Sequence, residues 1–203
     1  MMRADLEIIS DWIQPGSRIL DLGCGDGTLL THLRDSRQAT GYGLEIDEDN
    51  VTQCVASGLS VVQSDLDEGL GKFFSSTETS FDYAIMTQTL QAIREPQNLI
   101  DEMLSVAREG IVTFPNMAYW RNRIQLGIQG RMPVTRSLPN AWYNTPNIHL
   151  CTVQDFERLC DDLDIHILER TFVDAQHRSS ALKRVFPNLF AEVAIYRLQR
   201  KDR

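Results

Sequence analysis

Apolar residues recur along the chain with two alternating spacings, one typical of helices and one typical of buried strands. Leu6, Ile9 and Ile13 are spaced as on one face of a helix, and Pro15 with Gly16 indicates where that helix ends. Short apolar runs and further helical patterns then follow one another. The apolar runs predict seven strands, at residues 18–22, 40–45, 59–63, 81–86, 110–114, 165–172 and 191–198.

Between these runs the apolar residues return to helical spacing. Leu29–Leu33 and Val51–Val55 each carry one apolar face, and Pro96 opens a helix whose face covers Ile100–Ala107. Thr152–Asp155 has the form of a capping box, which predicts the start of another helix. Strands that alternate with helices in this way are joined by right-handed crossovers. The sequence therefore predicts a doubly wound, mostly parallel seven-stranded sheet with helices on both faces.

The alternation lapses from about residue 115 to residue 150, and no repeat, low-complexity tract or linker interrupts the rest. Hydrophobic residues make up 42% of the chain and charged residues 24%, as in ordinary globular proteins. We therefore interpret residues 1–203 as a single α/β domain with one irregular segment at about 115–150.

Cysteine usage and hydropathy limit the class of protein further. The 4 cysteines are scattered and form no Cys-x-x-Cys pair, so we expect neither a disulfide framework nor a metal site. This usage suits a reducing cytoplasm, and the first residues carry no recognisable secretion signal. No run approaches the roughly 18 apolar residues of a membrane span, so we expect no membrane insertion.

Charge is distributed unevenly, although the formal net charge of the whole chain is only −8. Acidic residues dominate the first half, whereas arginines accumulate in the second half. Nucleic-acid binding needs clustered cations to neutralise phosphates. Because the half with the most regular pattern is acidic, we expect no nucleic-acid partner.

The loop after the first predicted strand is rich in glycine, and its candidate ligand-binding residues are Asp21, Gly23, Cys24, Gly25 and Gly27. In a doubly wound sheet this loop lies where ligands bind. A dinucleotide fingerprint would place its third glycine, or an alanine, at position 28, which is Thr28 here. A pyrophosphate would also meet Asp21 and Asp26, at a cost on the order of 4 kcal/mol for each pair. The carboxylates favour a cationic ligand such as S-adenosylmethionine (SAM).

Carboxylates also end the next two predicted strands. Glu45, followed by Ile46, ends the second strand, where a carboxylate can accept both hydroxyls of a ribose. Asp65 and Leu66 follow the third strand, where they can bind an adenine amino group and pack on the ring. The alternative interpretations are an exposed strand-end charge for Glu45 and a helix cap for Asp65. The order of these acids along the chain favours the nucleoside interpretation.

These motifs resemble those of the class I SAM-dependent methyltransferases. The residues between 21 and 27 match the first motif of that superfamily, Glu45 its second-strand acid, and Asp65-Leu66 its adenine position. Phe81–Leu90 resembles its fourth strand and the following loop, which adds Thr87 and Gln88 to the expected site. The resemblance implies a Rossmann-like methyltransferase fold that binds SAM or S-adenosylhomocysteine.

The remaining third of the chain has a more specific resemblance. Thr113–Asn116, Trp120-Arg121, Gly130–Thr135 and Trp142–Thr152 are similar to the MetW family of methionine biosynthesis proteins. The resemblance implies a cytoplasmic protein that supports methionine synthesis as a partner of the homoserine O-acyltransferase MetX. No established methyl acceptor goes with that family.

The irregular segment contains arginines and aromatic residues but no acidic residue. Its candidate contact residues are Trp120, Arg121, Arg131, Trp142, Tyr143 and His149. This composition is typical of a protein–protein hot spot, and equally of a lid whose aromatic rings cover the cofactor pocket. His149 could act as a general base or bind a ligand, but we favour a loop-ordering role because no second titratable partner is evident.

Two functions remain open. The first is a SAM-binding partner that activates MetX and senses the supply of SAM. The second is a SAM-dependent methyltransferase that acts on a small molecule, although the sequence after the fourth strand lacks the signatures that would identify an acceptor. A weaker third alternative is an interaction module whose pocket is vestigial.

Overall fold

The computed structural model describes residues 4–74, 81–174, 183 and 185–201. Its strands are β1 (Arg18–Leu22), β2 (Thr40–Glu45), β3 (Val61–Gln63), β4 (Phe81–Thr87), β5 (Ala107–Pro115), β6 (Ile165–Val173) and β7 (Val193–Arg200). The α-helices are α1 (Ala4–Trp12), α2 (Thr28–Arg37), α3 (Glu48–Ala56), α4 (Pro96–Val106), α5 (Trp120–Gly127), α6 (Val153–Asp162) and α8 (Pro187–Phe190). Two short 3₁₀ turns are η1 (Leu66–Glu68) and η2 (Leu90–Ala92).

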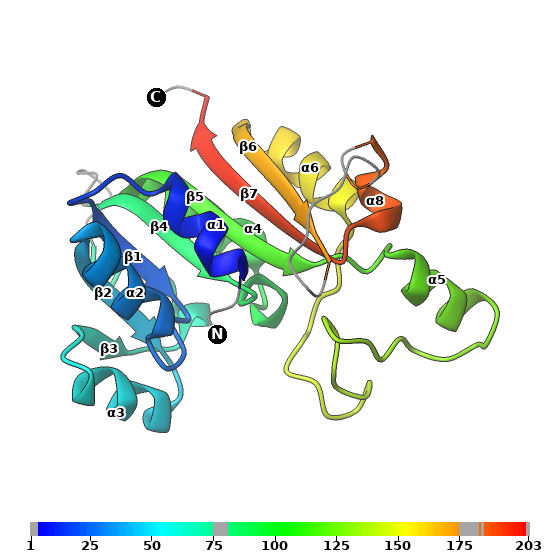
Figure 1. Cartoon of the computed structure of the whole chain (residues 1–203), viewed down its shortest axis with the longest axis horizontal. Helices are drawn as coiled ribbons and strands as arrows, with labels where there is room; N and C mark the ends of the chain where they lie inside the picture. The colour runs from blue at the N-terminus through cyan, green and yellow to red at the C-terminus, as the bar shows by residue number, and fades with distance from the viewer. Residues whose placement is uncertain (1–3, 75–80, 175–182, 184, 202–203) are drawn as a thin grey trace.

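The strands of the described residues form one sheet in the order β3-β2-β1-β4-β5-β7-β6. Pairing is parallel from β3 through β5, and β7 runs antiparallel to both of its neighbours. This confirms the mostly parallel seven-stranded sheet. The carboxyl ends of β1, β2 and β4 therefore lie along one edge, and the loops that follow them can meet there (Figure 1).

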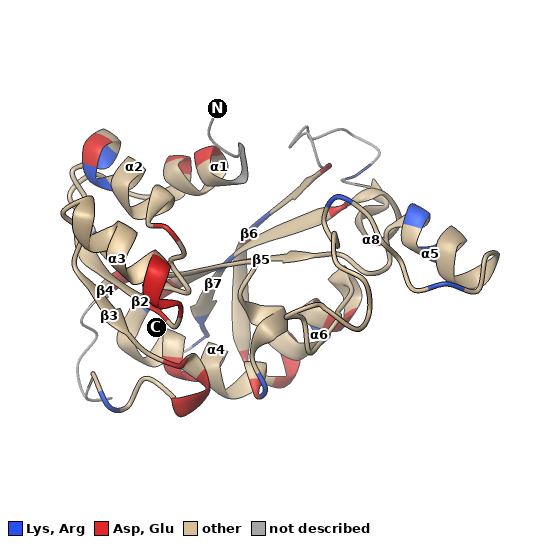
Figure 2. Cartoon of the chain, turned by 90° about the horizontal axis from the view of Figure 1, so that it is seen from below, with Lys and Arg blue, Asp and Glu red and all other residues tan. Residues whose placement is uncertain are grey.

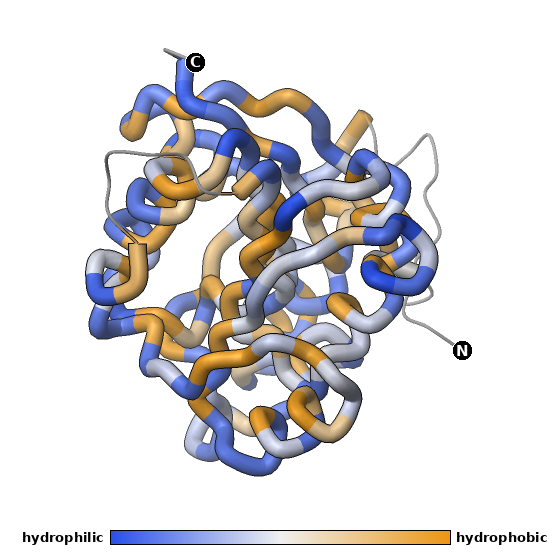
Figure 3. The backbone as a smooth tube through the Cα atoms, turned by 90° about the vertical axis from the view of Figure 1, so that its left-hand side faces the viewer, coloured by the Kyte–Doolittle hydropathy of each residue, from blue (hydrophilic) through white to orange (hydrophobic). Residues whose placement is uncertain are grey.

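Helices cover both faces of the sheet, as Figure 2 shows with α1, α2 and α3 on one side and α4 and α6 on the other. Side chains alternate between the faces along each strand. Ile19 packs in the cluster that includes Ile9 of α1 and Leu33 of α2, whereas Leu20 packs in the cluster that includes Ile100 of α4. The tube coloured by hydropathy shows apolar stretches running through the middle of the molecule (Figure 3).

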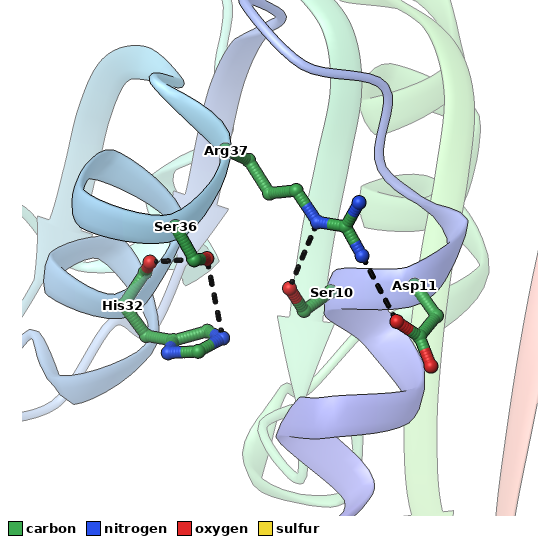
Figure 4. A network of polar contacts seen from close by, with 5 residues as sticks. All are labelled: Ser10, Asp11, His32, Ser36 and Arg37. Carbon is green, nitrogen blue, oxygen red and sulfur yellow. Dashed lines mark hydrogen bonds and ion pairs between the residues drawn. The ribbon is translucent and has the colours of Figure 1, made fainter.

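A polar contact joins α1 to α2 on the first of these faces (Figure 4). The guanidinium of Arg37 donates to Ser10 Oγ at 3.4 Å and to Asp11 Oδ1 at 2.9 Å. On α2 itself, Ser36 Oγ donates to the carbonyl of His32 at 2.7 Å. The contacts of Arg37 join the helix that precedes β1 to the helix that follows it.

Several predicted boundaries are wrong by a few residues. Ala107 was expected on the helix that Pro96 opens, but it pairs with Phe81 as the first residue of β5. A small buried residue suits either element, so its apolar spacing could not separate them. The third strand begins at Val61, where it pairs with Gly43 of β2, and the last begins at Val193, where it pairs with Pro115 of β5.

The segment predicted to be irregular contains a helix, α5. From Met117 to Leu150 the chain leaves the sheet and extends away from it with α5 at its outer part, and we call residues 117–150 the arm (Figure 1). The capping box is confirmed, because Thr152 and Asp155 hold each other's backbone amides at the start of α6. None of the helices described is long and apolar enough to cross a bilayer.

Candidate functional site

The glycine loop after β1 is packed between the loops that follow β2 and β4. The amides of Gly23 and Cys24 donate to the carbonyl of Leu44 at 2.8 and 3.1 Å. Gly23 has a φ of 75°, and a Cβ there would lie 2.5 Å from Thr89 Oγ1. Only glycine fits this position, because the loop after β4 touches the backbone directly.

Gly25 is different, because its backbone borders open space. It has a φ of 55°, and a Cβ built on it would meet no atom within 4 Å. Its amide donates to Glu45 Oε2 at 2.7 Å. Gly27 then caps α2 in the left-handed conformation, with Cys54 too close for a side chain. The exposed backbone at Gly25 leaves room for a ligand to approach the loop.

Glu45 organises this corner through three backbone amides. Besides Gly25, its carboxylate accepts from Ile46 and Asp47, each at 2.9 Å from Oε1. The side chain is almost fully buried. A carboxylate has about four lone-pair sites, and three are used here, so one site remains, on Oε2, which accepts from Gly25 alone. Glu45 is therefore structural and still able to accept one hydroxyl group.

Asp21 carries a buried carboxyl group in an unfavourable electrostatic environment. Its side chain is only 1% exposed, and neither carboxylate oxygen has a hydrogen-bond partner. Burial, and then the negative charge of Glu45, raises the pKa of Asp21 to about 7. A buried carboxylate without a partner is costly, and a cation placed beside it would favour the charged form.

Two buried thiols lie beneath the same loop. Cys24 and Cys54 have their sulfur atoms 4.0 Å apart, and Cys54 Sγ donates to the carbonyl of Gly25 at 3.3 Å. Burial raises the pKa of both thiols, and the charge of Asp21 adds to the shift at Cys24. They pack as small apolar groups beneath the loop, and a contact of Cys24 with a ligand stays a prediction.

The residues expected around an adenine lie in different environments: one caps a turn, one is buried in the core and one is exposed. Asp65 caps η1, because its Oδ1 accepts from the amide of Asp67 at 2.9 Å. Leu66 packs into the core. Ile46, next to Glu45, is 60% exposed and is the large apolar side chain that stands open at this edge. The capping alternative for Asp65 therefore describes a contact that exists, and a contact with a nucleobase stays a prediction.

The loop after β4 is held in a strained conformation. Gln88 has a φ of 56°, which is uncommon outside glycine. Its amide donates to the carbonyl and Oγ1 of Thr113 at 3.0 and 3.1 Å, and its carbonyl accepts from Gln91 Nε2 at 2.7 Å. Thr87, at the end of β4, precedes this turn and is half-buried. Thr87 and Gln88 are thus fixed beside the glycine loop through Thr89.

Gln91 is a residue that the sequence analysis missed. It is buried in η2, and its carbonyl accepts the amides of Ile148 and His149 at 2.7 and 2.9 Å. His149 Nε2 lies 3.0 Å from the carbonyl of Arg94, which is the kind of contact that a loop-ordering histidine makes. One polar residue among apolar neighbours carried no sequence signal, because its partners are distant in the chain.

Both ends of the arm are fixed at Asn116. The buried Asn116 accepts the amides of Ala118 and Val153 through Oδ1, at 3.1 and 3.4 Å. Its Nδ2 donates to the carbonyl of Ala191 at 2.9 Å. Met117 N donates to the carbonyl of Cys151 at 3.0 Å, which closes the base of the arm.

The aromatic residues predicted in the arm are displayed at its surface. Trp142 and Tyr143 are 73% and 74% exposed and contact each other edge to face at 5.8 Å. The Arg121 guanidinium lies 5.3 Å from the centre of the exposed Trp120 ring, and Arg131 is exposed. At 73% and 74% exposure, Trp142 and Tyr143 are not packed over another part of the chain in this conformation, and the partner surface and the lid both stay predictions. The described residues also contain no cluster of three side chains suited to a metal ion.

The fold defines a class of proteins. Solved structures of SAM-dependent methyltransferases share it over almost the whole chain. A SAM-dependent methyltransferase from Archaeoglobus fulgidus superposes with a TM-score of 0.69 at 16% identity, covering 98% of this chain and 92% of that one. One from Geobacter sulfurreducens, in complex with S-adenosylhomocysteine, gives 0.63 at 12% identity, covering 99% and 92%. The chain therefore has the SAM-dependent methyltransferase fold.

Sequence comparison identifies the family within that fold. The family model of the methionine biosynthesis protein MetW matches residues 3–198. The bifunctional methionine biosynthesis protein MetXA/MetW of Rhodopirellula baltica is 34% identical over 211 aligned residues, covering 100% of this chain. The chain spans 33% of the length of that relative. The chain belongs to the MetW family of methionine biosynthesis proteins.

Proposed function

We propose that this protein binds SAM and acts as a partner that supports homoserine O-acylation by MetX. The observation that carries the proposal is the relative from Rhodopirellula baltica, whose name joins a MetXA and a MetW function in one chain. Two proteins that occur fused in one organism commonly act together when they are separate. The proposed partner is the homoserine O-acyltransferase of the same cell.

The candidate site fits SAM by its chemistry. SAM carries an ammonium and a sulfonium, and Asp21 offers an unpartnered buried carboxylate next to Glu45. Gly25 leaves its side of the loop open, and Oε2 of Glu45 retains capacity for a ribose hydroxyl. Bound SAM would report the supply of a product that lies downstream of homoserine acylation. A ligand regulates by linkage only if it binds the free and the complexed forms unequally.

The test is a titration of purified homoserine O-acyltransferase with this protein, with and without SAM. We expect a complex on size-exclusion chromatography, a higher rate of acyl transfer, and a change in that rate when SAM is added. An unchanged rate together with no complex would refute the partner role. A complex that does not respond to SAM would refute only the sensing role.

A second candidate is a SAM-dependent methyltransferase that acts on a small molecule. The observation in its favour is that the glycine loop, Glu45 and the loop after β4 meet as one site with open backbone at Gly25. Incubation with methyl-labelled SAM and extracts from methionine-starved and fed cells would reveal a labelled product. Label that stays in SAM in both extracts would eliminate this candidate.

A further inference from the structure

The arm leaves an unusual concentration of apolar surface open. Besides Trp142 and Tyr143, large apolar side chains of the arm that are more than 40% exposed are Leu126, Ile128, Met132, Val134, Ile148 and Leu150. Single exposed apolar residues are normal on protein surfaces, but a contiguous group of them marks an interaction site. The group lies within one stretch of chain that leaves the sheet.

Four of these side chains, Met132, Trp142, Ile148 and Leu150, line a pocket. The pocket has a volume of about 160 Å³, and its walls include Met132, Trp142, Ile148, Leu150 and the buried Leu138. An apolar cavity of about 150 Å³ is large enough for a benzene-sized group. One aromatic or branched aliphatic side chain from outside could therefore fill it.

Internal hydrogen bonds hold this surface in shape. The side chain of Gln125 on α5 accepts the amide of Val134 at 2.9 Å and donates to its carbonyl at 3.3 Å. Thr135 N donates to the carbonyl of Leu138 at 2.9 Å, and Arg131 N to that of Gln125 at 3.1 Å. Because the pocket is preformed, little conformational entropy is lost when it is filled.

The charge of the arm selects the occupant. No Asp or Glu occurs between Glu109 and Asp155, and four arginines lie in the arm: Arg121, Arg123, Arg131 and Arg136. The helix α5 correspondingly shows blue and no red in Figure 2. Arginine pairs with carboxylates in a bidentate manner and, with Trp and Tyr, is the residue type that dominates binding energy at protein interfaces. The complementary surface is acidic and presents an apolar side chain.

We propose that the arm is the surface that binds the homoserine O-acyltransferase. An apolar side chain of the partner fills the pocket walled by Trp142, and carboxylates around it pair with the arginines of the arm. This inference rests on the proposed function and adds which surface performs it. The glycine loop lies at the carboxyl ends of the parallel strands and outside the arm. Residues of the arm can therefore be replaced while Asp21 and Glu45 are kept.

The experiment measures the affinity of purified homoserine O-acyltransferase for four variants by isothermal titration calorimetry. Trp142→Ala removes one wall of the pocket, and Arg131→Glu reverses a charge on the arm. Arg108→Glu makes the same charge reversal at the opposite end of β5, and Val55→Ala removes exposed apolar surface from α3. Thermal unfolding verifies that each variant is folded. SAM titration verifies that the glycine loop is unaffected.

We expect Trp142→Ala and Arg131→Glu each to weaken the complex at least tenfold, while Arg108→Glu and Val55→Ala bind like the wild type. Wild-type affinity in both arm variants would overturn the docking surface and leave the partner role intact. No complex with the wild-type protein would overturn both proposals. Sedimentation of the protein alone tests whether a second copy of this chain fills the pocket instead. Self-association that Trp142→Ala abolishes would assign the pocket to that second copy and overturn the proposal.

Discussion

The carbonyl oxygen of Gln91 accepts the backbone amide of His149 at 2.9 Å, which joins the turn after β4 to the end of the arm. The side chain of Gln91 simultaneously donates to the carbonyl of Gln88 at 2.7 Å. One buried residue thus contacts both the candidate ligand site and the proposed docking surface. A ligand that shifts Gln88 would move the same turn that holds the arm.

Replacing Gln91 should uncouple these two regions. In Gln91→Leu the side-chain bond to Gln88 is lost while the volume is nearly kept, and a net hydrogen bond contributes about 0.5–1.5 kcal/mol. We expect SAM to bind more weakly by about that amount and to lose most of its effect on acyltransferase affinity. Calorimetric titration of each ligand in the presence of the other measures this coupling, which is reciprocal.

Gln154→Leu, an equivalent change at an exposed position on α6, is the matched control. It should leave both affinities and their coupling as in the wild type. If Gln91→Leu retains full coupling, the turn after β4 does not transmit ligand binding to the arm.

Glu45 should be the main polar contact for a ribose. In Glu45→Ala the acceptor for a ribose hydroxyl disappears, and so do three backbone contacts that shape the loop. We expect SAM affinity to fall by about 1.5–3 kcal/mol, as for hydrogen bonds to a charged group. Asp49→Asn, which removes one negative charge from an exposed position on α3, should bind SAM normally. Equal affinities of the two variants in calorimetry would place the ribose elsewhere.

The capping box at α6 should stabilise the helix next to the base of the arm. Thr152 Oγ1 accepts from the amide of Asp155 at 3.2 Å, and Asp155 Oδ2 accepts from the amide of Thr152 at 3.1 Å. Loss of such a cap costs about 0.5–2 kcal/mol. We expect Thr152→Ala to lower the free energy of unfolding in urea by this amount, whereas Thr152→Ser, which keeps the hydroxyl, should stay near the wild type. An unchanged free energy of unfolding in Thr152→Ala would mean that packing alone stabilises this helix end.

Much of the fold could be predicted because burial imposes a period on the sequence. The first two strands, Arg18–Leu22 and Thr40–Glu45, have the predicted bounds. The helix α5 was missed because it packs little against the core. Its apolar residues Ile124 and Leu126 are exposed, so burial does not shape its pattern.

The candidate site shows the same division. Glycines and acidic residues at the ends of parallel strands predict a ligand site, because the topology of the sheet brings them to one edge. Asp21, Gly25 and Glu45 meet there as the sequence indicated. The bond from Gln91 to the arm depends on how two loops fold over each other, and no local pattern encodes that contact. The burial of Leu66 likewise follows from packing that spacing does not reveal.

Ionisation of Asp21 should destabilise the fold as the pH rises. Its pKa rises from 3.8 to about 7, first through burial and then through the charge of Glu45, so the folded state binds a proton that the unfolded state has released. Stability from the protonated carboxyl is complete below about pH 4 and is lost as the pH rises to about 7. At 1.36 kcal/mol per pKa unit, the loss is about 4 kcal/mol. Urea unfolding of the wild type and Asp21→Asn at several pH values measures it.

The two proteins should unfold with similar free energies near pH 4, and Asp21→Asn should be the more stable near pH 8. A constant difference between them across this range would mean that Asp21 ionises normally.

Binding of a cation should lower the raised pKa of Asp21. A positive ligand beside Asp21 favours the ionised carboxylate, so SAM binding at pH 6 should release a proton and become tighter between pH 6 and pH 8. Calorimetry in buffers of different ionisation enthalpy counts the proton, and Asp21→Asn should abolish both the release and the pH dependence. If SAM binds with no proton release and equal affinity in the wild type and Asp21→Asn, its charged groups do not lie beside Asp21. The buried carboxylate would then be a cost of the fold that no ligand relieves.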